Sequence, residues 1–452
     1  MQNNKNERGI KMDEKKLAKI RKNNMKLYPI YKMVGLDWIF YYGIEVLFLT
    51  EIKNISAADI VLAGSFYAFM YILFQVPNTI IIEKIGKRNA VVLGQLLNLI
   101  SMTIILVCPN FIWLLISQGI SAIGFGIKGI AESNLLNVSL PKAKRKGEIF
   151  SKIDGKGYSK FCFMGATSVL ISGFLYAINP YIPICLCLAV NLFALIIAMN
   201  FIDIEKETDQ KETKDINEEV KTILYDLKDG FKFIFKSKRL FTLLIFIGVL
   251  WGIISTFETY QKTLLKEMQI PSYYIGFMLA SFQLLVGIFS TKSNKFNKKH
   301  KNHSLTYIGL LLTLGSIILG IATILNIPFE IQLMFVTGVF IARAYAKGVY
   351  QVLKQRYMNN FSDSKILPKI YSINGIMSNI GKMVIGVIAS SILKVTDIYN
   401  ALLILGLICT GMIAILAIYS KSRLGLKPEE YKIEDIGEIK CELEKGVGRN
   451  KN

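Results

Sequence analysis

The sequence predicts an all-α membrane protein with twelve transmembrane helices in two pseudo-symmetric six-helix bundles. Of its 452 residues, 52% are hydrophobic and only 19% are charged, which is too apolar for a soluble protein of this length. The apolar residues form runs of about 20, the length of helix that crosses a hydrocarbon core of about 30 Å. Short motifs from the first half recur in the second half, which predicts a structural repeat.

The predicted spans are helices rather than strands of a barrel. A spanning barrel needs short segments with polar residues at every second position, whereas Val91 to Val107 and Leu305 to Ile321 are mostly apolar. The twelve spans are expected at 28–50, 59–82, 89–107, 111–137, 161–178, 182–202, 240–261, 273–291, 304–325, 331–353, 370–393 and 398–420.

The polar stretches divide the chain into five parts. The stretch between spans 6 and 7 is rich in charged residues, and its second part, 220–235, has apolar residues at helical spacing, which predicts an amphipathic helix at the membrane surface. The parts are a leader over 1–27, a bundle over 28–202, a linker over 203–238, a second bundle over 239–420 and a tail over 421–452.

The formal net charge of +21 raises the alternative of a nucleic-acid partner, which the placement of the charge argues against. Lys and Arg gather in the leader and after spans 4, 8 and 10, all on one side of the membrane. By the positive-inside rule both termini are cytoplasmic. We therefore expect a multi-pass protein of the plasma membrane, with the lipid bilayer as its partner and no nucleic acid.

Three short matches between the halves predict a parallel repeat of six plus six spans. In each match the paired segments run in the same direction, and the offset is close to half the chain. They are Phe74-Gln75 with Phe282-Gln283, Lys128-Gly129 with Lys347-Gly348, and Glu45 with Glu258.

The connection after span 2 carries a motif of one acid, one glycine and several bases. The motif consists of Glu83, Lys84, Gly86, Lys87 and Arg88. It resembles the signature Gly-x-x-x-Asp-Arg-x-Gly-Arg-Arg of the major facilitator superfamily, with Thr79 in place of the first glycine. The resemblance implies two six-helix bundles, alternating access and a cytoplasmic gate at this motif, where an acid at a helix end can pair with bases across the bundle.

Span 4 carries a second resemblance to the superfamily. Gln118-Gly119 is followed by Gly124, Gly126 and Gly129, which is similar to the glycine-rich fourth helix. Leu115 stands where proton-coupled members often have an arginine.

Ionisable residues within spans cost about 2.5 to 3.5 kcal/mol each at the membrane centre, so they usually face a cavity or a partner. Asp37 and Lys128 lie at similar depths, roughly 15 Å in at 1.5 Å per residue, and are close enough in depth to pair. The alternative is a set of salt bridges that only fixes helix packing. The expected cavity residues are Asp37, Tyr41, Lys128, Glu132, Arg343 and Lys347.

Two further acids, Glu45 and Glu258, are candidates for an outer gate, or else are simply solvated at the interface. Tyr41 is a candidate for stacking on a flat or cationic ligand, with a place in the core or interfacial belt as the alternative.

The sequence does not predict an enzyme. Gly375 to Lys382 lacks the spacing of a phosphate-binding loop, and His300 and His303 have no carboxylate or cysteine beside them. We find no nucleophile with a base, and we expect no cofactor and no metal.

The expected function is secondary active transport of a small-molecule substrate, driven by protons, another coupling ion or the solute's own gradient. The first hypothesis is export of small amphipathic or drug-like compounds, since the acids Asp37 and Glu132 suit cations or proton exchange. The alternative is uptake or exchange of an anionic metabolite, favoured by Lys128, Arg343 and Lys347. A non-transporting membrane sensor or scaffold that binds a partner through the linker or the tail is a third hypothesis.

Overall fold

The computed structural model describes residues 2–141, 146–204, 225, 228, 232, 238–300, 303–324, 327–360 and 367–421. Ten helices in this part of the chain are long and apolar enough to cross a membrane, and a bent helix pair brings the number to as many as eleven. The fold is therefore that of a polytopic helical membrane protein. The ten helices are α5 (Lys87–Val107), α6 (Phe111–Ser139), α7 (Lys146–Ile178), α8 (Ile182–Met199), α11 (Lys238–Glu267), α12 (Ser272–Ser290), α14 (Ser304–Ile324), α15 (Phe329–Asn360), α16 (Leu367–Val395) and α17 (Ile398–Lys421).

The first predicted span is not one helix, so the prediction over 28–50 is wrong. Helix α1 (Gln2–Gly35) includes most of the expected polar leader and ends at Gly35. An irregular stretch, 36–44, separates it from α2 (Glu45–Leu47) and the π-helix η1 (Phe48–Ile52). Within the stretch Phe40 has φ 71°, which no α-helix allows, and the Asp37 carboxylate accepts a hydrogen bond from the Trp38 N–H at 2.7 Å. Such local bonds from Asp compete with helix formation.

The second predicted span, 59–82, is also interrupted. It consists of α3 (Ala57–Leu73) and α4 (Gln75–Ile85), bent by 55° at the break. Pro77 explains the bend, because it has no N–H to donate to the carbonyl of Leu73 and its ring crowds that carbonyl. The amphipathic helix predicted over 220–235 lies outside the described residues except for Tyr225, Lys228 and Lys232, and the tail beyond Lys421 also lies outside them.

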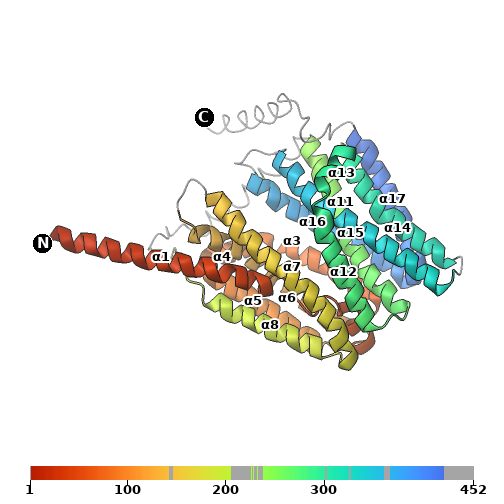
Figure 1. Ribbon diagram of the computed structural model, residues 1–452, viewed down its shortest axis with the longest axis horizontal. Coiled ribbons are helices and arrows are strands. Elements are labelled where there is room, and N and C mark those ends of the chain that lie inside the picture. The colour runs from red at the N-terminus through yellow and green to blue at the C-terminus, as the bar shows by residue number, and fades with distance from the viewer. Residues whose placement is uncertain are drawn as a thin grey trace. The chain divides into compact units, whose positions relative to one another are not determined.

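The chain forms two compact units. Unit 1 consists of 1–55, 73–221 and 271–280. In it α5 and α6 lie side by side, and α1 packs against α7 and α8 (Figure 1). The contact of α5 with α6 depends on glycine, since a Cβ added to Gly94 would lie 2.7 Å from the carbonyl oxygen of Gly124. The apolar core of unit 1 includes Tyr31, Ile127 and Ala131, none of which exposes any surface.

Unit 2 consists of 56–72, 222–270 and 281–452. Helices α11 and α16 cross closely in it, and α14 packs against α15 and α17 (Figure 1). The short helix α13 (Ser293–His300) packs against α15 and α14. The crossing of α11 with α16 is set by small residues, because a Cβ on Gly252 would lie 2.4 Å from the carbonyl oxygen of Gly381. Small residues allow such close approach in membranes, where helix packing has no hydrophobic driving force.

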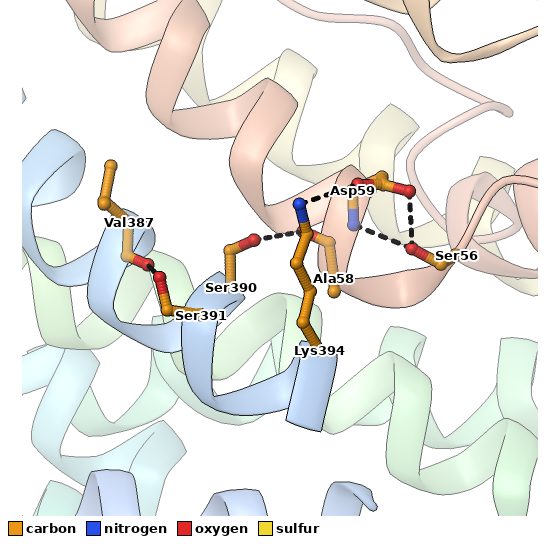
Figure 2. A network of polar contacts seen from close by, with 7 residues as sticks. All are labelled: Ser56, Ala58, Asp59, Val387, Ser390, Ser391 and Lys394. Carbon is orange, nitrogen blue, oxygen red and sulfur yellow. Dashed lines mark hydrogen bonds and ion pairs between the residues drawn. The ribbon is translucent and has the colours of Figure 1, made fainter. Parts of the chain in front are cut away.

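The two units do not follow the halves of the sequence throughout. Residues 56–72, which include most of α3, belong to unit 2, and Figure 2 shows Ala58 and Asp59 beside Ser390 and Lys394 of α16. The Ser390 hydroxyl donates to the Ala58 carbonyl at 2.8 Å, and the Lys394 Nζ lies 3.5 Å from the Asp59 carboxylate. Helix α3 itself begins with a cap, in which the Asp59 N–H donates to the Ser56 hydroxyl at 3.1 Å. The bundles over 28–202 and 239–420 stay a prediction.

Candidate functional site

Lys128 lies in α6 with 2% of its surface exposed. Its Nζ donates to the carbonyl oxygen of Gly35 and to Oε1 of Gln95, the latter at 3.3 Å. Gly35 is the last residue of α1, so its carbonyl has no helical N–H partner, and an unsatisfied carbonyl is costly within a membrane. The amine of Lys128 therefore closes the end of the broken first span, a role that the sequence did not predict.

Gln95 of α5 extends this contact to a fourth helix, α8. Its Nε2 donates to Oδ1 of Asn191 in α8 at 3.0 Å, and Gln95 and Asn191 are buried. The end of α1 is thus tied through α6 and α5 to α8. Neither amide was a predicted site residue, and both are polar residues within apolar spans, which is the signal that could have identified them.

Glu132 lies one helical turn beyond Lys128, on the same face of α6. Only 4% of its surface is exposed, and its Oε2 has no hydrogen-bond partner within the described part of the chain. The amine of Lys128 donates to Gly35 and Gln95 rather than to this carboxylate. Glu132 is therefore a buried acid that its neighbours do not fully satisfy.

Asp37 and Tyr41 lie in the irregular stretch 36–44. The Asp37 side chain is exposed, whereas Tyr41 is 2% exposed. Trp38 lies between Tyr41 and Phe125 of α6, with ring centroids 5.9 Å and 5.7 Å away. This packing favours the core interpretation of Tyr41. The Nζ of Lys128 bonds the carbonyl oxygen of Gly35, and the expected pairing of Lys128 with Asp37 stays a prediction.

Two predicted residues from different groups meet in unit 2. The Nζ of Lys347 in α15 forms an ion pair with the carboxylate of Glu258 in α11. Their side chains are 13% and 22% exposed. The positive charge expected in the cavity and the negative charge expected at the outer gate therefore neutralise each other between two helices.

Arg343 lies in α15, one turn before Lys347 and near the middle of the span Phe329–Met358. It is 3% exposed, its Nη2 donates to the Ser316 hydroxyl at 2.5 Å, and its Cζ lies 4.6 Å from the centre of the Phe257 ring. Nε and Nη1 have no hydrogen-bond partner among the described residues. Ser316 and Phe257 were not predicted, because an apolar span does not reveal which of its faces meets a neighbouring helix.

The motif runs from the last turn of α4 to the first turn of α5 and forms a tight connection within unit 1. Gly86 joins α4 to α5 with φ 88°, a conformation that favours glycine. Glu83 and Lys87 are partly buried and Lys84 is exposed. The Arg88 guanidinium donates from Nη2 to the carbonyl of Met199 at 2.6 Å, at the end of α8. Glu45, the other outer-gate candidate, is partly buried at the start of α2.

The sequence did not predict one ion pair of unit 1, which joins α1 to α7. Lys32 of α1 forms an ion pair with Asp154 of α7, which also accepts a hydrogen bond from the Tyr28 hydroxyl at 2.8 Å. Asp154 lies before the predicted fifth span, which the sequence placed at 161–178, whereas α7 begins at Lys146.

Apolar helices with ionisable side chains buried within them are typical of polytopic membrane proteins that move ions or solutes. The sequence model of the Major Facilitator Superfamily matches residues 27–344, which is more than half of the chain. The chain belongs to this superfamily, whose members are transporters and not enzymes.

A curated relative is the uncharacterized MFS-type transporter YxaM of Bacillus subtilis (strain 168). It is 20% identical over 369 residues, which cover 80% of this chain and 87% of the relative.

Solved structures share the fold at low sequence identity. The crystal structure of the nucleoside transporter NupG is similar with a TM-score of 0.64 and 12% identity, covering 91% of this chain and 100% of that one. The crystal structure of a POT family transporter in complex with 5-aminolevulinic acid has a TM-score of 0.60 and 14% identity, covering 90% of this chain and 96% of that one. The crystal structure of a D-xylose-proton symporter has a TM-score of 0.61 and 11% identity, covering 88% of this chain and 96% of that one. At these identities the likeness shows the fold alone.

Proposed function

We propose that this chain exports small amphipathic compounds across the plasma membrane by alternating access, in exchange for protons. Both termini are cytoplasmic in this proposal, which the one-sided Lys and Arg clusters support. The observation that carries the proposal is the buried carboxylate of Glu132, one oxygen of which has no partner in the described part of the chain.

A buried ionised carboxylate without a full set of partners is costly, and its neutral form costs much less. Such a group takes up a proton when it is enclosed and releases it when water reaches it. Alternating access would connect the two conditions to the two sides of the membrane. Glu132 would then carry the coupling proton, in a protein where Leu115 replaces the arginine common in proton-coupled relatives.

The motif of Glu83, Lys84, Gly86, Lys87 and Arg88 is proposed as the cytoplasmic gate. The bond from Arg88 to the end of α8 supports this, because it gives the connection a fixed anchor in unit 1. Glu45 remains the proposed outer gate. The ion pair of Glu258 with Lys347 favours a packing role for these two residues.

The test is transport in liposomes that contain the purified full chain, with a panel of fluorescent amphipathic dyes and an imposed pH gradient. We expect the wild type to move dye against its gradient when the pH gradient is present. Glu132→Gln is expected to reduce this gradient-driven transport at least about tenfold, since it removes the titrating group. Dye exchange without a pH gradient should persist, because the substitution keeps the shape of the side chain.

The control is Glu330→Gln, which changes an exposed acid in the first turn of α15. It should leave both transport modes unchanged. Glu132→Gln protein that still couples dye movement to the pH gradient like the wild type would contradict the proposal.

A second candidate function is uptake or exchange of an anionic metabolite, which the buried guanidinium of Arg343 favours. The same liposomes distinguish export from uptake. The pH gradient can be imposed in either orientation, and protease access shows which way the protein is inserted.

A further inference from the structure

We propose that Arg343, Ser316 and Phe257 form a binding site in unit 2 for the carboxylate of an amphipathic organic acid. The inference deepens the proposed function by naming the polar group of the exported compound. It rests on that function for transport, although binding itself can be measured separately.

The first argument is the unused hydrogen-bonding capacity of Arg343. A guanidinium offers five N–H donors in a planar fork and stays charged. Only Nη2 has a partner among the described residues, while Nε and Nη1 are buried and without one. A buried donor left unsatisfied costs about 1 to 3 kcal/mol, and more when it is charged. A ligand that accepts these bonds recovers that free energy.

The second argument is charge. Within the described residues no carboxylate forms an ion pair with Arg343, since the acid on the facing helix, Glu258, is paired with Lys347. One turn of α15 thus holds a compensated cation at Lys347 and an uncompensated one at Arg343. The missing counter-charge fits a single anionic group supplied from outside the chain.

The third argument is geometry. Phe257 lies over the guanidinium at 4.6 Å, and Ser316 fixes one nitrogen at 2.5 Å. These contacts from α11 and α14 hold the plane of the fork before a ligand arrives. A fixed fork binds a carboxylate with two parallel bonds, which a flexible amine cannot do.

The fourth argument concerns the rest of the ligand. Arg343 lies mid-span, and its partners come from two strongly apolar helices, α11 and α14. A ligand whose carboxylate reaches this guanidinium must place its other atoms among apolar side chains. An acid with an aromatic or aliphatic body satisfies both conditions, whereas a small hydrophilic anion does not.

The test is isothermal titration of the full chain in neutral detergent with benzoate, benzyl alcohol and inorganic phosphate. We expect benzoate to bind and the other two probes to bind at least about tenfold more weakly, because one lacks the charge and the other lacks the apolar body. Arg343→Gln should weaken benzoate binding at least about tenfold, and Arg343→Lys should restore only part of it. Ser316→Ala should weaken it severalfold.

The matched control is Arg356→Gln on the same helix, where the guanidinium donates to Asn294 at 2.9 Å in an exposed position. It should bind benzoate like the wild type. Folding of each variant is checked by its melting curve. If Arg343→Gln does not fold, Ser316→Ala tests the same site with a smaller change.

Three results would overturn the proposal. They are equal binding of benzoate and benzyl alcohol by the wild type, unchanged benzoate binding by folded Arg343→Gln, and displacement of benzoate by phosphatidylglycerol micelles, which would make this a lipid site. No pH gradient is present in this assay, so its failure is distinct from failure of the Glu132 test.

Discussion

Gly381→Ala is expected to destabilise unit 2 by about 3 kcal/mol or more, because the added methyl group meets backbone atoms that cannot turn aside. A Cβ on Gly381 would lie 2.0 Å from the carbonyl oxygen of Gly248 and 2.5 Å from its carbonyl carbon. A second glycine of α11 also lies close to Gly381, since a Cβ on Gly252 would lie 2.4 Å from the carbonyl oxygen of Gly381. Helices α11 and α16 would have to separate.

The measurement is unfolding of the purified chain in detergent, by temperature and by titration with a denaturing detergent. Gly375→Ala on the same helix is the matched control, because a Cβ there has no atom within 4 Å. It should be neutral or slightly stabilising, as alanine is the better helix former. Equal stability of the two variants would show that α11 and α16 do not cross as described.

Glu258→Gln is expected to cost about 3 to 5 kcal/mol, because it leaves the amine of Lys347 largely buried without its counter-charge. The double variant Glu258→Gln with Lys347→Met should recover most of that loss, since it removes both charges. The exchange Glu258→Lys with Lys347→Glu should recover part of it. The same unfolding measurements on the wild type, Glu258→Gln, Lys347→Met and their double variant give the interaction free energy of the pair.

Helix α11 also carries the control for this cycle. Lys266 and Glu267 form a pair at 3.9 Å, with side chains 27% and 51% exposed. Glu267→Gln should cost less than about 1 kcal/mol, because water screens exposed pairs. Comparable losses from Glu258→Gln and Glu267→Gln would mean that the charge of Glu258 is not compensated within the membrane by Lys347.

Much of the fold was predictable because the membrane restricts the choices. Apolar runs of spanning length must be helices, and α5, α6, α8 and α14 begin and end close to their predicted limits. The bend between α3 and α4 also had a visible signal in Pro77. The irregular stretch 36–44 had no sequence signal of comparable strength, because Asp37 and the nearby Gly35 and Gly43 are compatible with several backbone conformations.

The site divides in the same way. Burial of Lys128, Glu132 and Arg343 follows from their place in apolar spans, since a charge there must avoid lipid. Their partners did not follow. Lys128 bonds a carbonyl that exists as a free acceptor only because α1 ends at Gly35, and that ending is itself a tertiary outcome.

By itself, the sequence determined the class of the protein, most of the helical spans and the residues that carry charge at membrane depth, because hydropathy along one chain is a local property. Only the tertiary structure decided which charges compensate each other. Glu258 satisfies Lys347, whereas Arg343 keeps donors without a partner among the described residues, and this depends on the faces that α11, α14 and α15 turn toward one another. Helix rotation of this kind is set by packing between side chains distant in sequence, which no local pattern records.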